Sequence, residues 1–462
     1  MALHEECGVF GLYDFDGGNV APYVAYGLVA LQHRGQESCG IAITRDREVA
    51  HYKDLGMVAD VLSDKVLERL DGYMAIGHVR YSTHGSSTRE NAQPLVMRYK
   101  KGTLSIAHNV NLSISDELRE KLENSGAVFQ TSTDSETIAY LIAKERIFSG
   151  SVEEAVRKAM LNLKGAYSLL VMSPQKLIAA RDPYGFRPLC MGKFNNTYVF
   201  ASETCALDAV GAEYVRDIEP GEIVLADEQG VRTESKVPAM PAPCIFEYIY
   251  FARPDSVLNG VSVLKSRQKA GALLAQQHPV EADVVIGVPD SGIDAAVGYS
   301  KQSGIPYERG FIKNSYVGRS FIKPKQSDRD RTVKLKINPL ADNVRGKRVV
   351  MIDDSIVRGT TSARIVQMIR DAGAKEVHMR VASPHFLWPC YFGTDIPDRS
   401  NLAAVGRTDE EICQMIGADS LGYLSIDSLH ELIGSDQFCR GCFSGEYPYD
   451  VSKKLDYDDL IY

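Results

Sequence analysis

The chain has 462 residues, enough for two to four domains at ~150 residues each. Hydrophobic residues make up 44% and charged residues 24%, which are the proportions of an ordinary globular protein and argue against a disordered, collagen-like or coiled-coil chain. The formal net charge of −8 disfavours broad nucleic-acid binding. No apolar run reaches the ~18 residues that a membrane span requires.

The beginning of the chain and its cysteines bear on the compartment. Residues 1–6 hold two acids and no basic or apolar stretch, which is not the pattern of a signal peptide. The nine cysteines show no disulfide-like spacing in a chain of this length. Both features predict a protein of the reducing cytoplasm.

The first half alternates short strands with helices. Alternating or apolar runs predict strands, and two longer segments predict helices, the second with Ser151 as its N-cap and acids in its first turn. The predicted strands cover 104–107, 167–172 and 222–226, and the predicted helices cover 134–146 and 151–163. This mixture predicts an α+β sandwich over residues 7–236.

A proline-rich stretch separates the two halves. Pro238, Pro241 and Pro243 break regular structure, so residues 237–243 are predicted to be a linker. Beyond it, apolar strands alternate with helices, which predicts a parallel α/β sheet over residues 244–430. The strands are expected at 282–288, 348–352 and 376–382, and the helices at 293–302 and 363–372. Residues 431–462 are predicted to be a loop-like tail.

One segment of the second half is strongly basic. Residues 309–348 contain 12 Lys and Arg against three Asp. Such a run is typical of a solvated basic face, and it also suits a segment that meets a polyanionic small molecule. Composition does not decide between these two interpretations.

The most informative motif is V-V-M-I-D-D-S-I-V-R-G-T-T-S, at residues 349–362. A predicted buried strand ends at Asp353 and Asp354, and a Gly-Thr-Thr-Ser turn opens the next helix. Small residues there allow backbone N–H groups to surround a phosphate at the helix N-terminus. The paired acids suit sugar hydroxyls or Mg²⁺, although an acid pair also caps helices that bind nothing.

This motif resembles the phosphoribosyl-pyrophosphate (PRPP) loop of the type I phosphoribosyltransferases. The resemblance implies that Asp353 and Asp354 hold the ribose hydroxyls and Mg²⁺. It assigns the 5′-phosphate and its surroundings to Ser355, Arg358, Gly359, Thr360, Thr361 and Ser362. The V-P-D-S-G motif at 288–292 takes the place of the pyrophosphate loop, with Asp290 and Ser291 binding PRPP and Ser291 also at the Mg²⁺ site. The basic segment then becomes a loop that closes over the substrate.

In the first half, Cys7 precedes an apolar run, and alone it would be a buried small hydrophobe. Its companions give it a second interpretation. They are L-Q-H-R-G-Q-E at 31–37, G-H-V-R-Y-S-T at 77–83, A-H-N at 107–109, T-S-T-D-S-E at 131–136 and R-D-P-Y-G-F-R-P-L at 181–189. Together these motifs resemble the glutaminase domain of the N-terminal-nucleophile amidotransferases, which implies an αββα sandwich.

That resemblance also implies residue roles. Cys7 would be the nucleophile and its own α-amino group the base, because an α-amino group titrates near ~7.7–8. Residues 1–6 would then be a propeptide removed by self-cleavage. The resemblance assigns the glutamine carboxylate to Arg80, the glutamine ammonium to Asp134, the oxyanion to Asn109, and the positioning of Cys7 to Arg34 and Gly35. We expect His33, His78 and His108 to be structural.

The chain departs from the amidotransferase pattern at one position. The family reads His-Asn-Gly-Asn where this chain has His108-Asn109-Val110-Asn111. The backbone N–H of Val110 can still serve as the second oxyanion donor. If the site requires a positive φ, a β-branched residue is strained by ~1–3 kcal/mol. We therefore hypothesise a weakened or altered glutaminase.

Five cysteines lie in the second half and the tail. Cys439 and Cys442 form a C-x-x-C, which alone could be a zinc half-site, a redox pair or neither. Resemblance to the Bacillus-like branch of the glutamine PRPP amidotransferases implies a [4Fe–4S] cluster on Cys244, Cys390, Cys439 and Cys442, and four thiolates also suit zinc. Core positions are expected for Cys39, Cys190, Cys205 and Cys413.

Both halves together resemble one family, the amidophosphoribosyltransferases, from Cys7 to about Tyr449. The resemblance implies that ammonia from glutamine displaces pyrophosphate from PRPP, which gives 5-phosphoribosylamine in the first step of purine synthesis. It also implies one Mg²⁺ per subunit, feedback inhibition by purine nucleotides and a homotetramer. Three alternatives are an amidotransferase with another acceptor, a non-catalytic PRPP-binding regulator, and an enzyme that uses free ammonia better than glutamine.

Overall fold

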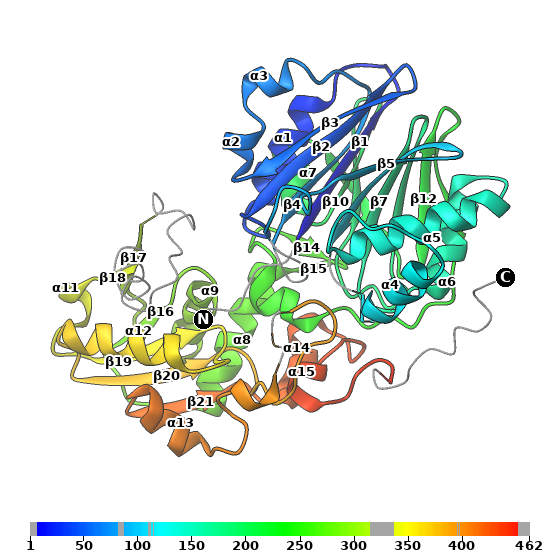
Figure 1. The fold of residues 1–462 in the computed structure, drawn as a ribbon. Coiled ribbons are helices and arrows are strands. Elements are labelled where there is room, and N and C mark those ends of the chain that lie inside the picture. Colours follow the sequence, from blue (N-terminus) through cyan, green and yellow to red (C-terminus); the bar gives the residue numbers. More distant parts are fainter. Residues whose placement is uncertain are drawn as a thin grey trace.

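A computed structural model describes residues 7–81, 87–109, 112–113, 115–314, 337–394, 396 and 398–450. The chain forms two bodies, a β-sandwich from the first half and an α/β domain from the second (Figure 1). Within the described residues, no helix is long and apolar enough to cross a membrane.

The first sheet of the sandwich has β1, the strand directly after Cys7, at its middle. Its seven strands run antiparallel in the order β11-β9-β10-β1-β4-β2-β3. β1 pairs with β4 on one side, with Gly8 opposite Val79, and with β10 on the other, with Phe10 opposite Ala201. The strands are β1 (Gly8–Asp14), β2 (Ser38–Arg45), β3 (Glu48–Leu55), β4 (Met74–Arg80), β9 (Cys190–Phe194), β10 (Thr197–Ala201) and β11 (Glu213–Asp217).

The second sheet is also antiparallel and has six strands in the order β13-β12-β8-β7-β6-β5. They are β5 (Leu95–Tyr99), β6 (Gly102–Asn109), β7 (Ser168–Ser173), β8 (Lys176–Arg181), β12 (Glu222–Asp227) and β13 (Gly230–Lys236). The strand predictions for 104–107, 167–172 and 222–226 fall on β6, β7 and β12, so they are confirmed.

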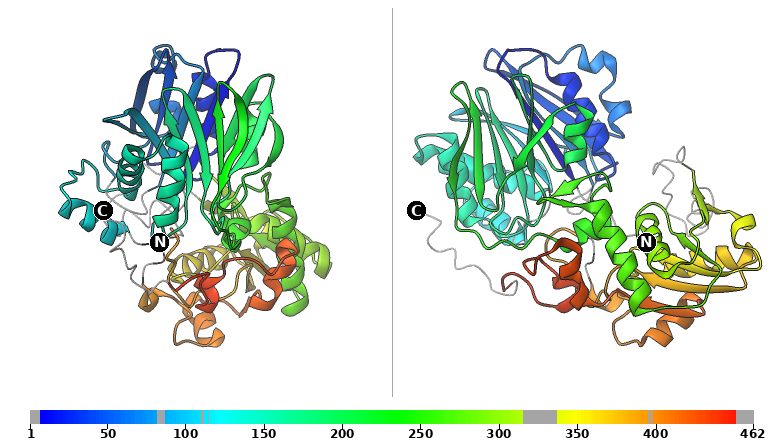
Figure 2. Two further views of the ribbon diagram at one scale, coloured as in Figure 1. Left: turned by 90° about the vertical axis from the view of Figure 1, so that its right-hand side faces the viewer. Right: turned by 180° about the vertical axis from the view of Figure 1, so that it is seen from behind.

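Two layers of helices enclose the two sheets, and Figure 2 shows the sheets face to face between them. Val9 and Ile76 of the first sheet pack against Leu170 and Val224 of the second, all fully buried. The first sheet is covered by α1 (Ala21–Ala30), α2 (Val58–Val61), α3 (Asp64–Leu67) and α7 (Thr204–Ala209), and the second by α4 (Ser115–Asn124), α5 (Asp134–Phe148) and α6 (Val152–Asn162). The predicted αββα sandwich is therefore confirmed.

The second predicted helix has the expected start. α6 begins after Ser151, whose Oγ accepts a hydrogen bond from the Glu154 N–H at 3.2 Å. An N-cap of this kind satisfies one of the backbone donors that the first turn leaves without an intrahelical partner.

The proline-rich segment lies along the sandwich. Met240 N–H donates to Pro183 O at 3.0 Å, and Ala242 N–H donates to Tyr184 O at 2.7 Å. A π-helical turn, Glu247–Phe251, follows, and then the hairpin β14 (Val257–Leu258) and β15 (Val261–Ser262). The second half is therefore anchored to the first by backbone hydrogen bonds before its own sheet begins.

The second half has a four-stranded parallel sheet, in the order β16-β19-β20-β21, and confirms the parallel α/β prediction. Val350 and Ile352 of β19 face α8 and α9, whereas Val349 and Met351 face α12 and α13. Both faces are buried, which explains the uninterrupted apolar run of this strand. The elements are β16 (Val284–Gly287), β19 (Arg348–Asp353), β20 (Glu376–Val381), β21 (Ser420–Tyr423), α8 (Val263–Gln277), α9 (Gly292–Ser303), α12 (Thr360–Asp371) and α13 (Asp409–Ile416).

Smaller elements complete the second half. β17 (Phe311–Lys313) pairs with β18 (Ile337–Pro339), and α11 (Ala341–Val344) follows. Most of the basic segment, residues 315–336, lies outside the described residues. The tail contains the short helix α15 (Gly441–Ser444) after α14 (Leu429–Ile433), so its prediction as loop alone was wrong at 441–444. Tyr449 hydroxyl and Ser113 Oγ lie 2.7 Å apart, so the tail reaches back to the sandwich.

Close packing of α8 on α9 predicts a sensitive position. A Cβ at Gly271 would lie 1.8 Å from Ala295 O, so Gly271→Ala must force the two helices apart. Overpacking of this kind costs ~3 kcal/mol. We expect a clearly lower urea midpoint for the unfolding of this domain. The same change at exposed Gly150, where a Cβ would meet only Glu154 Oε2 at 3.6 Å, should leave the midpoint nearly unchanged, and an equal loss in both variants would contradict the packing argument.

Candidate functional site

Cys7 lies directly before β1, in the middle of the first sheet. The residue is 6% exposed, and its thiol donates to Tyr81 O at 3.4 Å and accepts from Tyr81 N–H at 3.5 Å. Because β1 and β4 are antiparallel neighbours, the first residues of β1 lie beside the last residues of β4, at one end of the strands. This places Cys7 beside the Arg80–Tyr81 segment.

Arg34 and Gly35 lie in a turn that packs beside Cys7 and the end of β4. Arg34 Nε donates to Cys7 O at 2.9 Å, and the Arg34 side chain is fully buried. A Cβ at Gly35 would lie 2.7 Å from the backbone of Val79 and Arg80, so only glycine allows this turn to pack against the end of β4. Arg34 thus contacts Cys7 itself, and Gly35 contacts the end of the neighbouring strand β4.

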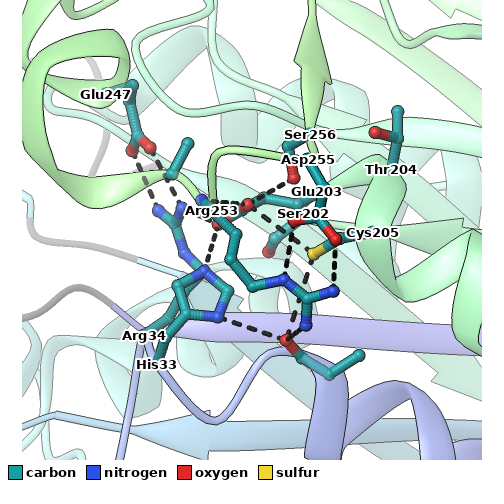
Figure 3. Close-up of polar contacts among 12 residues, drawn as sticks. His33, Arg34, Ser202, Glu203, Thr204, Cys205, Glu247, Arg253, Asp255 and Ser256 are labelled. Atoms are coloured by element: carbon teal, nitrogen blue, oxygen red, sulfur yellow. Dashed lines mark hydrogen bonds and ion pairs between the residues drawn. The ribbon is translucent and has the colours of Figure 1, made fainter. Parts of the chain in front are cut away.

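A buried ion network surrounds Arg34 (Figure 3). Its guanidinium donates to Glu203 Oε1 at 2.6 Å and to both oxygens of Glu247 at 2.9 and 3.0 Å. Arg187 also donates to Glu247 Oε1, at 3.0 Å, and His33 Nε2 lies 2.8 Å from Glu203 Oε1. Burial alone would raise the pKa of Glu203, but the charges of His33 and Arg34 hold it well below its usual value.

The expected glutamine-binding and oxyanion residues lie where the two sheets face each other. Arg80 ends β4 and Asn109 ends β6, and His78 Nε2 joins these strands through His108 O at 2.9 Å. Asp134 begins α5, accepts from Leu112 N–H at 2.9 Å and lies 3.7 Å from His108 Nδ1. Asp134 and Asn109 are therefore both adjacent to His108.

The side-chain amide of Asn109 stands out in this group. It is fully buried, and neither its nitrogen nor its oxygen has a hydrogen-bond partner among the described residues. A buried amide without a partner is costly unless a ligand supplies one. An amide of this kind is suited to donate to an oxyanion. Val110, the next residue, lies outside the described residues.

The three histidines of these motifs, His33, His78 and His108, contact neighbouring groups of the protein. Burial lowers the pKa of His78 to about 3 and also lowers the pKa of His108, so both rings are neutral at pH 7. His33 contacts Glu203 and the carbonyl of Ala30. All three bond with neighbouring groups of the protein, as expected.

In the second half, Asp353 and Asp354 lie at the carboxyl end of β19. Asp354 accepts from Ser291 Oγ and from Ser355 Oγ, each at 2.5 Å, and donates its N–H to Asp353 Oδ1 at 3.0 Å. Burial raises the pKa of both carboxyls, and the charge of Asp354 raises that of Asp353 further. Two buried acids at this edge are poorly stabilised as ions by the protein alone.

Two loops border this acid pair. The first contains Asp290 and Ser291 and leads into α9, and a Cβ at Gly292 would lie 2.4 Å from Ile352 O, which holds that loop against β19. Asp290 forms an ion pair with Lys313 at the end of β17. The sequence prediction placed Ser291 at the acid pair, and the structure brings these residues together.

The second loop leads into α12. Arg358 lies in the turn, Gly359 has a φ of +78° and precedes the helix, and Thr360, Thr361 and Ser362 form the first turn. Gly359 thus occupies the left-handed region that glycine tolerates. The N-terminus of a helix directs N–H groups and a partial positive charge at whatever binds there, and it favours a phosphate.

The four cysteines of the expected cluster line one cavity. Cys244, Cys390, Cys439 and Cys442 surround it together with aromatic side chains of Phe186, Phe246, Phe386, Phe392 and Tyr447. Burial raises the pKa of Cys244 to about 12, and the neighbouring Cys390 adds to the shift. In the described part of the chain, however, no group of three or more His, Cys, Asp or Glu is arranged to hold a metal ion.

Three of the other cysteines match their predicted core positions. Cys39, Cys190 and Cys205 are at most 2% exposed. Cys413, in the middle of α13, is only half-buried, so its prediction as a core residue was wrong.

Comparisons with known proteins match both halves. Residues 78–209 match the model of a glutamine amidotransferase domain, and residues 262–383 match that of a phosphoribosyl transferase domain. The amidophosphoribosyltransferase of Methanocaldococcus jannaschii is 48% identical over 96% of this chain and 98% of its own length. The chain belongs to the amidophosphoribosyltransferase family.

Further relatives agree with this membership. The amidophosphoribosyltransferase of Bacillus subtilis is 46% identical over 97% of this chain and 95% of its own length. A solved structure, glutamine phosphoribosylpyrophosphate amidotransferase from B. subtilis in complex with ADP and GMP, has a TM-score of 0.89 at 45% identity, covering 96% of this chain and 98% of that chain.

The reaction of this family member follows from both domains. It transfers ammonia from glutamine to PRPP and gives 5-phosphoribosylamine, glutamate and pyrophosphate, in the first step of purine biosynthesis. The amidotransferase alternative with another acceptor and the non-catalytic regulator are therefore not supported.

Sequence reasoning missed the acids around Arg34. No sequence motif assigns a role to Glu203 or Glu247, although both are buried and bind its guanidinium. One signal was present, because Glu247 is a single acid inside the apolar run I-F-E-Y-I-Y-F at 245–251, and a buried acid requires a partner. Arg187, in the R-D-P-Y-G-F-R-P-L motif, is one of those partners.

Charge burial at the acid pair predicts a stabilising substitution. Because the folded state raises the pKa of Asp354, the ionised pair opposes folding, increasingly so as the pH rises above ~4. At pH 7.5 in EDTA, Asp354→Asn should raise the free energy of unfolding by ~1 kcal/mol, or the Tm by ~2–4 °C.

A matched substitution, Asp227→Asn, should change the Tm in the opposite direction. Asp227 is also buried, but a bidentate hydrogen bond from Arg232 lowers its pKa. Asp227→Asn should therefore lower the Tm. If Asp354→Asn lowers the Tm by as much as Asp227→Asn does, the acid pair is not under electrostatic strain.

Proposed function

We propose that Cys7 carries out the glutaminase step and that the acid-pair loop carries out the transfer to PRPP. The observation that supports the first assignment most strongly is the Asn109 amide, buried without a protein partner among the described residues and next to the strand end that holds Arg80. A site that leaves a donor of this kind unpaired is prepared for a ligand oxygen.

The glutaminase step uses residues from four segments. Arg80 binds the α-carboxylate of glutamine in bidentate fashion and Asp134 binds its α-ammonium. The free α-amino group of Cys7 accepts the thiol proton, and the sulfur attacks the amide carbon. Asn109 and the backbone N–H of Val110 donate to the oxyanion, ammonia leaves, and water hydrolyses the thioester to glutamate. This chemistry requires removal of residues 1–6.

The transfer step uses the carboxyl edge of the parallel sheet. Asp353 and Asp354 hold the ribose hydroxyls, and Arg358, Gly359 and the first turn of α12 bind the 5′-phosphate. Ser355 supports Asp354, while Asp290 and Ser291 lie on the pyrophosphate side. Ammonia attacks C1 of PRPP from the face opposite the leaving pyrophosphate, and the acids stabilise the positive charge that develops on the ribose.

The acid pair also fits one Mg²⁺ per subunit. Two carboxylates and Ser291 are fewer ligands than a self-sufficient protein site has, as expected for Mg²⁺, which takes its remaining ligands from water and substrate oxygens. Because burial raises the pKa of both acids, a divalent cation between them would stabilise their ionised forms. When bound, Mg²⁺ would polarise the pyrophosphate leaving group.

The four thiols lining the aromatic cavity fit a [4Fe–4S] cluster in kind and number. Four cysteine thiolates are the usual ligands of such a cluster, and an apolar cavity shields it. The cluster would tie the tail, through Cys439 and Cys442, to Cys244 after the linker and to Cys390. Cys439 N–H already donates to Pro243 O at 2.9 Å.

Other features remain proposals from family membership. They are a homotetramer, a cytoplasmic location, and feedback inhibition by purine nucleotides bound at the Thr360–Thr361–Ser362 loop. The B. subtilis relative was solved in complex with ADP and GMP, which supports nucleotide regulation. We also propose the domain boundaries 1–6, 7–236, 237–243, 244–430 and 431–462.

Cys7→Ala tests whether glutamine hydrolysis and the transfer to PRPP take place at separate sites. The variant should form no 5-phosphoribosylamine from PRPP and glutamine but should retain the wild-type rate with ammonium, because the transfer site is intact. Both rates can be measured by pyrophosphate release. Loss of both rates, or retention of the glutamine rate, would remove Cys7 from the proposed role.

Val110→Gly tests the altered oxyanion site. If valine strains the site or misdirects its N–H group, glycine should raise glutamine turnover, by up to ~10², and leave the ammonium rate unchanged. Equal glutamine turnover in the two proteins would show that valine is tolerated. If the wild-type protein retains residues 1–6 and uses ammonium but not glutamine, the uncleaved segment, and not Val110, explains the missing glutaminase activity.

Metal analysis of anaerobically purified protein tests the cluster. We expect about four iron and four sulfide per chain and a loss of both in Cys442→Ser. Cys413→Ser should retain both, because Cys413 is half-buried on α13, away from the cavity. If the analysis finds zinc and no sulfide, the four cysteines form a zinc site and the cluster proposal is wrong.

A further inference from the structure

Glu247 connects the nucleophile of the first half to the second half. It is the first residue of the π-helical turn Glu247–Phe251, and its carboxylate is 2% exposed. Both of its oxygens accept from Arg34, at 2.9 and 3.0 Å, and Arg34 Nε donates to the carbonyl of Cys7 at 2.9 Å. Only the Arg34 side chain separates Glu247 from the nucleophile residue.

Two arginines and two glutamates at the centre of this network carry balancing charges and are buried. Arg34 and Arg187 face Glu203 and Glu247, and all four side chains are at most 2% exposed. A bidentate carboxylate fixes the plane of a guanidinium as well as its position. Glu203 takes one nitrogen of Arg34, whereas Glu247 takes two and therefore determines the orientation of the group.

The other side of the π-helical turn is held by the second half. Arg267 of α8 donates to the carbonyls of Tyr248, Tyr250 and Ala252 at 3.0, 2.9 and 2.7 Å. Its guanidinium also lies 4.0 Å from Asp294 of α9, the helix that follows Ser291. The position of Glu247 is therefore set by helices of the transfer domain.

We propose that Glu247 is a positioning residue of the glutaminase reaction. It holds Arg34, and through Arg34 the main chain of Cys7, in the geometry of attack, so a residue of the transfer domain governs glutamine hydrolysis. The proposal rests on the assignment of Cys7 as the nucleophile. Asp134, assigned to the glutamine ammonium, is held instead by Leu112 and His108, so this part of the glutamine site has its own support.

Glu247→Gln is the direct test. Glutamine keeps the shape but replaces one oxygen with an NH₂ group that faces a guanidinium. We expect kcat with glutamine to fall ~10- to 100-fold, the effect of a small misplacement of a reacting group. The KM for glutamine should change less than ~3-fold, and the rate with ammonium should remain that of the wild type. Alkylation of Cys7 by iodoacetamide should slow as well.

A matched control separates positioning from stability. Glu222 is 1% exposed and accepts from both terminal nitrogens of Arg216 at 2.8 Å, in the same half of the chain as Cys7 but on strand β12 of the other sheet. Glu222→Gln removes an equivalent charge, so it should leave the ratio of the glutamine rate to the ammonium rate unchanged. If Glu247→Gln lowers both rates equally, or lowers neither, Glu247 is not a positioning residue.

The same series distinguishes this proposal from the proposed function. Wild-type hydrolysis of glutamine that disappears in Cys7→Ala supports the role of Cys7, whatever Glu247→Gln does. Glutamine hydrolysis that persists in Cys7→Ala overturns both proposals. A wild-type glutamine kcat in Glu247→Gln, beside an inactive Cys7→Ala, overturns the positioning role alone.

Discussion

The guanidinium of Arg34 bears a full positive charge where no water reaches it, and the arrangement of both halves depends on how that charge is compensated. Burying an ion costs several kcal/mol, which a partner offsets only with good geometry and full hydrogen bonding. Here Glu203 comes from the start of α7 and Glu247 from the turn after the linker. A buried network of this kind is weak evidence for stability, but it specifies one relative position of three distant segments.

Both candidate sites lie at strand ends. Cys7 precedes β1, and Arg80 and Asn109 end β4 and β6, while Asp353 ends β19. The strand interiors hold large apolar cores on both faces, as in Val9 and Val350, and cannot accept polar ligands. Reactive side chains are therefore placed where the last hydrogen bonds of the sheet fix the backbone and the next residues are released into loops.

Local sequence patterns were sufficient to predict much of the fold and of the two candidate sites. The acid pair, the glycine before α12 and the cysteine before β1 each lie within a short motif whose local geometry follows from residue type. Periodicity likewise predicted β6, β7, β12, α5 and α6 to within a few residues. What the patterns could not provide was the ion network, because Arg34 meets Glu203 and Glu247 across 169 and 213 positions. Only the tertiary fold brings such residues together.

The pairing of β1 has a consequence for protein synthesis. The strand that follows Cys7 lies between β4 and β10, and Phe10 is opposite Ala201. A ribosome that adds ~5–20 residues per second needs roughly 10–40 s to make the intervening chain. Until then the first strand has no neighbour on one side, and the carboxylate of Glu247 follows later still. A nascent chain that ends before β10 therefore lacks one of the two strands that pair with β1.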